Sequence, residues 1–266
     1  MSNQPIGIFD SGVGGLTIWK AVQDKLPNES IIYLADQRNC PYGNREKNEI
    51  INLTKQSVSF LISKECKLII IACNTATALA IKHLRETFPD VPFVGLEPSV
   101  KPAALNTHKK VIGVLATANT LVGKHYLETS ARYGKKIKIN AVAAHGLVEL
   151  IESESNELIL EKLLVKYLEI LDYRNIDYLV LGCTHYPLVI EKLQQLCGDS
   201  IKIIDSADAV ANQVSKILRY QFMINLSSNN SKYHFYTTGI LEPFKKFVLN
   251  RFIKESETVN FHELLV

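Results

Sequence analysis

Short apolar runs alternate along the chain with segments in which apolar residues recur every three or four positions. The runs are rich in β-branched residues, as expected of buried strands. These predicted strands lie at residues 6–9, 31–35, 68–72, 93–96, 111–117, 137–143, 178–182 and 201–204. The segments between them have helical periodicity, as at Leu16, Trp19, Val22 and Leu26. Because strand and helix alternation is typical of parallel sheets joined by crossover helices, the pattern predicts an α/β fold.

The strand pattern restarts in the middle of the chain. Residues 111–117 resemble the first strand, and Thr117 lies near the position that corresponds to Asp10. We therefore predict two similar domains with mostly parallel sheets flanked by helices. The first comprises residues 1–97 plus 207–266 and the second comprises 98–206, because the second half is complete by about residue 205. Within the returning tail, the sequence Leu-Ser-Ser-Asn-Asn-Ser at 226–231 predicts a short loop.

Two of the predicted strands end at a cysteine that is followed by small polar residues. Cys73 stands in Ile-Ala-Cys-Asn-Thr-Ala, and Cys183 stands in Leu-Gly-Cys-Thr-His-Tyr. Ligands of open α/β sheets bind where strand ends face helix starts. A free cysteine taken alone is usually a small buried apolar side chain. Because both cysteines share one context, we favour a pair of thiols that exchange protons with a substrate, since a thiol titrates near pH ~8.5.

The remaining cysteines and the composition argue against several classes of protein. The chain has five cysteines, and an odd number without a Cys-x-x-Cys pair disfavours disulfides and a zinc site. Cys40, Cys66 and Cys197 lack the strand-end context and are predicted to be structural. A net charge of +3 with 21% charged residues forms no basic stripe, so neither nucleic acid nor a membrane surface is an expected partner. No apolar run approaches the ~20 residues of a membrane span and no secretion signal is evident, so a cytoplasmic protein is expected.

Polar residues that could bind a substrate follow both thiols. Asn74 and Thr75 follow the first, and Thr184 and His185 follow the second. Their side chains can donate hydrogen bonds to a carboxylate, as can the N–H groups of a helix start. As an imidazolium, His185 would favour a thiolate. The alternative is a histidine that is hydrogen-bonded at a helix start.

Asp10 and Ser11 follow the first strand and precede Gly12-Val-Gly-Gly. The aspartate could cap the next helix. Because the glycines let a ligand approach the backbone, we favour a carboxylate that binds an ammonium group or orients a thiol proton. The same glycines with Asp36 loosely resemble a dinucleotide-binding turn. That pattern requires a glycine where this chain has Thr17, so a nicotinamide-dependent oxidoreductase is the weaker alternative.

Further acids and a turn have ordinary interpretations. Tyr42 and Gly43 follow a proline and fit a turn, although an N–H beside the glycine could hold a carboxylate. Asp36 is expected to be a loop acid that is either solvated or near the site. Glu152 lies where acids alternate with apolar residues, and a solvated helix face is the default prediction there.

Four separated motifs together resemble those of glutamate racemases, the cofactor-independent enzymes that supply D-glutamate for peptidoglycan. The motifs are Gly-Ile-Phe-Asp-Ser-Gly-Val-Gly-Gly-Leu at 7–16, Pro-Tyr-Gly at 41–43, Ala-Cys-Asn-Thr-Ala at 72–76 and Leu-Gly-Cys-Thr-His-Tyr-Pro at 181–187. The resemblance implies two α/β domains related by pseudo-two-fold symmetry, with glutamate bound in the cleft between them. It also implies catalysis without a cofactor or metal, and a homodimer is expected.

The resemblance implies a role for each motif residue. Cys73 would act as the base for one glutamate enantiomer and Cys183 for the other, with Asp10 assisting the first thiol and His185 the second. The residues implied to bind substrate are Asp10, Ser11, Tyr42, Gly43, Asn74, Thr75, Thr184 and His185. The residues expected in supporting positions are Asp36, Thr117 and Glu152.

Other functions share some of these features. A racemase for aspartate or hydantoins, or a maleate isomerase, would have the same fold and the same cysteine pair. A nicotinamide-dependent oxidoreductase and a non-catalytic amino-acid-binding protein are the alternatives from other functional classes.

Overall fold

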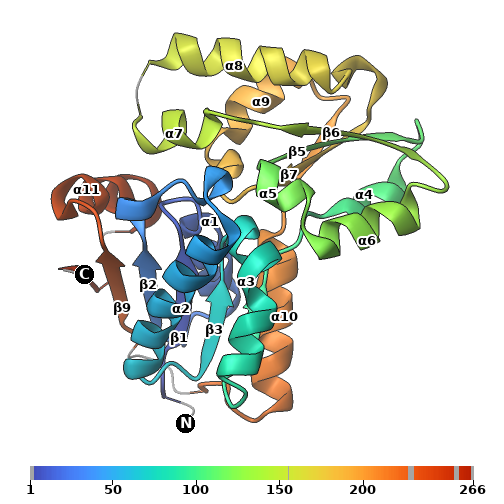
Figure 1. Cartoon of the computed structure of the whole chain (residues 1–266). Coiled ribbons are helices and arrows are strands. Elements are labelled where there is room, and N and C mark those ends of the chain that lie inside the picture. The colour runs from blue at the N-terminus through green and yellow to red at the C-terminus, as the bar shows by residue number, and fades with distance from the viewer. Residues whose placement is uncertain (1–2, 155, 227–230, 255–257, 265–266) are drawn as a thin grey trace. The chain divides into compact units, whose positions relative to one another are not determined.

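The computed structural model describes residues 3–154, 156–226, 231–254 and 258–264, and the chain divides into two compact units (Figure 1). Unit 1 comprises Met1–Leu96 together with Ala207–Val266, and unit 2 comprises Glu97–Ser206. Each unit contains a parallel sheet flanked by helices. The predicted α/β fold class is therefore confirmed.

The described strands of unit 1 form one sheet in the order β10-β9-β2-β1-β3-β4. They are β1 (Ile6–Asp10), β2 (Ile31–Ala35), β3 (Leu68–Ile71), β4 (Phe93–Gly95), β9 (Tyr233–Thr237) and β10 (Val259–Glu263). Every residue of β1, β2 and β3 is buried, because helices cover both faces of such a sheet. Asp10 pairs with Ala35, and Phe9 pairs with Ile71. The carboxyl ends of these three strands therefore meet at one edge of the sheet.

Helices connect the strands of unit 1. They are α1 (Leu16–Lys25), α2 (Lys47–Ser63), α3 (Asn74–Thr87), α10 (Ala207–Tyr220) and α11 (Leu241–Phe252), with the short 3₁₀ turns η1 (Gln37–Asn39) and η2 (Tyr42–Asn44). Gly15, directly before α1, permits a close approach of backbone and side chain. A Cβ atom there would lie 2.6 Å from the Cβ of Asp10, so a larger residue would displace that aspartate.

The sheet of unit 2 has the order β6-β5-β7-β8 among the described strands. The strands are β5 (Val111–Ala116), β6 (Lys138–Ala143), β7 (Tyr178–Gly182) and β8 (Lys202–Ile204). The helices are α4 (Val100–Asn106), α5 (Ala118–Leu121), α6 (Lys124–Tyr133), α7 (Leu147–Glu152), α8 (Glu157–Ile170) and α9 (Ile190–Cys197), with the 3₁₀ turns η3 (Tyr173–Asn175) and η4 (Tyr186–Val189). Ala116 pairs with Gly182, so Thr117 and Cys183 leave neighbouring strands at the same edge.

Some elements were not expected from the sequence pattern. The prediction assigned no element to α4, α10 or β10. In α10 the buried Val210, Val214 and Leu218 do recur at helical spacing, whereas β10 is an edge strand with no fully buried residue and therefore lacks an apolar run. The segment after β5 forms two helices, α5 and α6, with Val122 and Gly123 between them.

The tail after unit 2 is integrated into the sheet and helices of unit 1. β9 pairs with β2, from Ile31 with Tyr233 to Ala35 with Thr237, and α10 packs against α1. The tail therefore supplies residues to the sheet edge where β1, β2 and β3 end. Of the loop predicted at 226–231, residues 227–230 lie outside the described residues.

A buried ion pair anchors the segment that follows α10. The Nζ of Lys67 lies 2.6 Å from Oε2 of Glu29, and each side chain is 1% exposed. Lys67 also donates a hydrogen bond to the carbonyl of Met223, and the N–H of Asn225 donates to Glu29. In the described part of the chain, no helix combines the length and the apolar character that a membrane crossing requires.

Candidate active site

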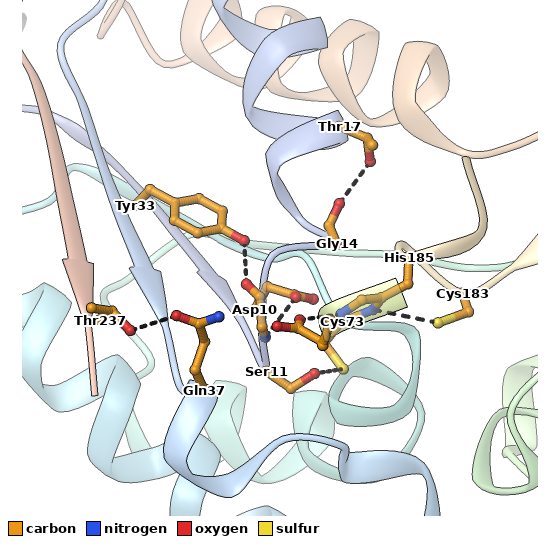
Figure 2. A network of polar contacts seen from close by, with 12 residues as sticks. Asp10, Ser11, Gly14, Thr17, Tyr33, Gln37, Cys73, Cys183, His185 and Thr237 are labelled. Carbon is orange, nitrogen blue, oxygen red and sulfur yellow. Dashed lines mark hydrogen bonds and ion pairs between the residues drawn. The ribbon is translucent and has the colours of Figure 1, made fainter. Parts of the chain in front are cut away.

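Cys73 stands between the end of β3 and the start of α3. Its sulfur accepts a hydrogen bond from the N–H of Ala76 at 3.5 Å, so the cysteine caps this helix. The hydroxyl of Ser11 lies 3.6 Å from the same sulfur (Figure 2). A helix N-terminus and a nearby hydroxyl both stabilise negative charge, so these two groups would stabilise a thiolate at this position. Cys73 is only 5% exposed, so water has little access to its sulfur.

Asp10 ends β1, the strand beside β3, and is fully buried. Its carboxylate accepts the N–H of Gly12 at 2.8 Å, and the carbonyl of Gly12 accepts the hydroxyl of Tyr33 at 2.7 Å. The residue that precedes α1 is Gly15, and this helix has no side-chain cap. The helix-capping interpretation of Asp10 is therefore wrong, because its carboxylate binds within the glycine loop instead.

Asn74 offers a donor without a partner. It is 4% exposed, and its side-chain nitrogen makes no hydrogen bond to any of the described residues. Buried polar atoms are rarely left unpaired in proteins. A carboxylate bound beside Cys73 would satisfy this nitrogen. Thr75 is also buried directly after it.

Asp36 organises a second group of polar side chains in unit 1. Its carboxylate accepts hydrogen bonds from the Tyr42 hydroxyl at 2.6 Å, from the Thr238 hydroxyl at 2.8 Å and from the side-chain amide of Asn39 at 3.0 Å. Asp36 is 3% exposed, so the alternative prediction of a solvated loop acid is wrong. The hydrogen bond from Tyr42 to Asp36 therefore fixes the orientation of the Tyr42 hydroxyl.

Tyr42 and Gly43 form the predicted turn, which is the buried 3₁₀ turn η2 after a cis Cys40–Pro41 peptide bond. Burial, followed by the charge and hydrogen bond of Asp36, raises the pKa of Tyr42 far above its usual value. The charges of Cys73 and Asp10 act in the same direction. Tyr42 is therefore a neutral hydroxyl close to the thiol of unit 1.

Cys183 follows β7 directly and is 7% exposed. Its sulfur lies 3.8 Å from Nδ1 of His185 (Figure 2), and Nε2 of this ring lies 2.6 Å from a carboxylate oxygen of Glu152. The side chain of His185 is 2% exposed and that of Glu152 is 16% exposed. A carboxylate on one ring nitrogen stabilises the imidazolium, and an imidazolium stabilises a neighbouring thiolate.

The solvated-face prediction for Glu152 is wrong. Glu152 ends the short helix α7, and this position directs its carboxylate to His185 rather than to solvent.

Thr117 accepts the N–H of Thr120 with its side chain and so caps α5. Thr184 is 4% exposed beside the second thiol. The neighbouring positions of Thr117 and Cys183 follow from the pairing of β5 with β7.

Sequence reasoning missed Tyr33, Thr238 and Tyr186. Tyr33 and Thr238 act through the contacts given above, and a lone tyrosine in a strand or a threonine in the tail carries no pattern that would reveal them. The Tyr186 hydroxyl is fully buried near Cys183. Burial, followed by the charge of Cys183, raises its pKa well above the usual value, so it stays a neutral group near this thiol.

Two of the remaining cysteines are unsuited to proton transfer near neutral pH. Burial raises the pKa of Cys66 to about 12 and that of Cys197 to about 11. Each thiol therefore stays protonated and acts as a small apolar side chain. The two strand-end thiols, by contrast, have polar side chains close to the sulfur: Ser11 beside Cys73 and His185 beside Cys183.

The model of the family described as Asp/Glu/Hydantoin racemase matches residues 17–214. The chain belongs to this family. Together with the relatives that follow, this makes it an amino-acid racemase, which is an isomerase, and not an oxidoreductase. The glutamate racemase of Roseiflexus sp. (strain RS-1) is 41% identical over 251 residues, which cover 93% of this chain and 92% of the relative.

Solved structures of similar proteins have the same fold. The RacE1 isoform of glutamate racemase from Bacillus anthracis superposes with a TM-score of 0.86 at 32% identity and covers 100% of both chains. The glutamate racemase of Francisella tularensis, solved in complex with D-glutamate, gives a TM-score of 0.83 at 31% identity and covers 98% of both chains. These likenesses extend over the returning tail as well as the four motifs.

Proposed function

We propose that this chain interconverts L- and D-glutamate without a cofactor, with Cys73 and Cys183 exchanging protons with Cα from opposite faces. The observation that carries the proposal is the equivalent position of the two thiols. Each is almost fully buried, follows a strand that lies inside its sheet and has polar partners of its own. Glutamate as the substrate is supported by the names of the relatives and by the D-glutamate bound to the Francisella tularensis protein.

Racemisation needs a base on one face of the substrate and an acid on the other, and a thiolate with a thiol can serve in both directions. In one direction the Cys73 thiolate removes the proton from Cα, and the Cys183 thiol delivers a proton to the opposite face. In the reverse direction the roles are exchanged. Ser11 and the N–H of Ala76 stabilise the first thiolate, and His185 stabilises the second.

Stabilising the deprotonated substrate is the harder task, because a proton on Cα is far less acidic than a thiol. Hydrogen-bond donors held in a site from which water is excluded can stabilise the developing charge. Asn74 supplies such a donor, and we assign Ser11, Thr75, Thr184 and the N–H groups of the Tyr42–Gly43 turn to the same task. Asp10 would bind the substrate ammonium or assist the first thiol.

The decisive experiment follows the isotope at Cα rather than the rate alone. L- and D-glutamate have equal energies in water, so kcat/KM must be equal in both directions and cannot assign the bases. In D₂O, two bases should give D-glutamate that carries deuterium while the remaining L-glutamate keeps its proton at early times. A product that retains its proton would indicate a single base and would contradict the assignment. Cys73→Ser and Cys183→Ser should each lower kcat at least about 100-fold.

Substrate choice and assembly complete the proposal. Comparing kcat/KM for glutamate, aspartate and a hydantoin tests the specificity, and a higher value for either of the other substrates would replace glutamate. We further propose that the D-glutamate supplies peptidoglycan synthesis, which complementation of a strain that requires D-glutamate would test. The expected homodimer is tested by light scattering of the eluted protein.

A further inference from the structure

Unit 1 contains a cavity of about 390 Å³ beside α2. Small-molecule sites in proteins commonly have volumes of this order, roughly 300–1,000 Å³. Residues of η1, α2 and the tail line it, and Cys73 is not among them. The cavity is therefore separate from the groups that contact the thiol.

The wall of this cavity is apolar on one side and carries positive charge. Leu53, Phe60 and Leu264 line it with their apolar side chains, and Arg38 lines it at an exposed position. Glutamate, with three charged groups, would leave this apolar wall uncovered. A molecule with one carboxylate and an aromatic body matches both features, because its ring covers the apolar wall and its carboxylate faces Arg38.

The polar side of the cavity is the group that orients Tyr42. Asp36, Asn39 and Thr238 all line the cavity, and the Asp36 carboxylate binds the other two side chains as well as the Tyr42 hydroxyl. The N–H of Arg38 also donates to the Thr238 hydroxyl at 3.1 Å. A molecule in the cavity would contact the partners of Asp36, and a single hydrogen bond links Asp36 to Tyr42.

We propose that this cavity binds a small aromatic monocarboxylate, and that the bound molecule lowers the racemisation rate by shifting Asp36 and thereby Tyr42. The binding site is independent of the proposed function. The effect on rate rests on that function, so binding and rate are measured separately.

Binding is tested with 3-phenylpropionate as the probe, by calorimetric titration and by saturation transfer from protein to probe. The expected dissociation constant is on the order of 1 mM for a ligand of this size, and neutral 3-phenylpropionamide should bind about threefold more weakly. Ser57→Phe places a ring in the cavity and should abolish binding, because Ser57 lines it. Ser59→Phe is the matched control, since Ser59 is exposed on the same helix and does not line the cavity. Arg38→Gln should weaken binding about threefold, because it removes the positive charge in the cavity wall. Lys55→Gln is the matched control: Lys55 is exposed on α2 and does not line the cavity, so this change should not weaken binding.

The rate is then measured with and without saturating probe. Wild type and Ser59→Phe should lose at least about threefold in kcat/KM, whereas Ser57→Phe should lose nothing. Absence of binding to wild type, or binding that survives in Ser57→Phe, overturns the proposed site. Inhibition that persists in Ser57→Phe would show competition at the substrate site and overturns the coupling, as does binding without any change in rate. If the protein racemises nothing, the proposed function fails while the titration still decides the site.

Discussion

Two nitrogens of one imidazole connect an acid to a thiol in unit 2. The Nε2 atom of His185 lies 2.6 Å from the carboxylate of Glu152, and Nδ1 lies 3.8 Å from the sulfur of Cys183. The carboxylate fixes the orientation of the ring and stabilises its protonated form. A positive charge on the His185 ring beside Cys183 would therefore depend on a residue that does not itself contact the sulfur.

We expect Glu152→Gln to lower kcat about tenfold or more, because the amide keeps the size of the side chain but removes the charge that stabilises the imidazolium. Glu149→Gln, on the exposed side of the same helix, is the matched control and should stay close to wild type. Initial rates with saturating L-glutamate provide the measurement. Equal rates for Glu152→Gln and wild type would remove Glu152 from the mechanism.

The thiol of Cys66 should make the fold less stable at high pH. Burial raises its pKa from 9.0 to about 12, so between these values the unfolded chain loses a proton that the folded chain keeps. The free energy of unfolding therefore falls as the pH rises above 9, by about 1.4 kcal/mol per unit from this group. Urea titrations at pH 8 and pH 10 should show a loss for wild type that is about 1.4 kcal/mol larger than for Cys66→Ala.

The control for this pH effect is Ser63→Ala, because Ser63 is exposed at the end of α2 and its side chain does not titrate between pH 8 and pH 10. Its loss between pH 8 and pH 10 should equal that of wild type. Identical losses for Cys66→Ala and wild type would show that the Cys66 thiol ionises as easily in the folded as in the unfolded chain.

Replacement of Phe222 by glycine should stabilise the protein. Phe222 follows α10 with a φ of 54° and is 91% exposed, and the next N–H, of Met223, bonds back to the carbonyl of Leu218 at 2.8 Å. Glycine is preferred at this left-handed position because it has no Cβ. We expect Phe222→Gly to raise the free energy of unfolding by about 0.5–1 kcal/mol in urea titrations. Tyr220→Gly, within the last turn of the helix, should lower it by a similar amount, and stabilisation by both would contradict the argument.

Removal of one partner of the buried ion pair should be costly. Lys67→Met leaves the Glu29 carboxylate buried without its cation, and the expected loss in the free energy of unfolding is about 3–5 kcal/mol. The double variant Lys67→Met with Glu29→Leu should recover much of this loss, because no charge then remains buried. A single variant that loses less than about 1 kcal/mol would show that water reaches this pair.

Local sequence determined the strands of both sheets up to the tail, and with them the positions of the two thiols. A buried strand and the first turn of the following helix are contiguous, so an apolar run that ends in Cys-Asn-Thr or Cys-Thr-His places the thiol at the end of that strand. The structure confirms these positions for Cys73 and Cys183. The sequence also indicated the glycine loop at residues 12, 14 and 15, because the close approach of another group to the backbone depends only on glycine having no side chain.

Only the tertiary structure decided which side chains support those thiols. The Thr238 hydroxyl reaches Asp36 across 202 positions because β9 pairs with β2, and the order of strands in a sheet is not encoded in the period of any one strand. Glu152 had the pattern of a solvated acid, yet the end of α7 directs it to His185. Local periodicity sets which residues are buried, whereas the partners of a buried polar group depend on how distant elements pack.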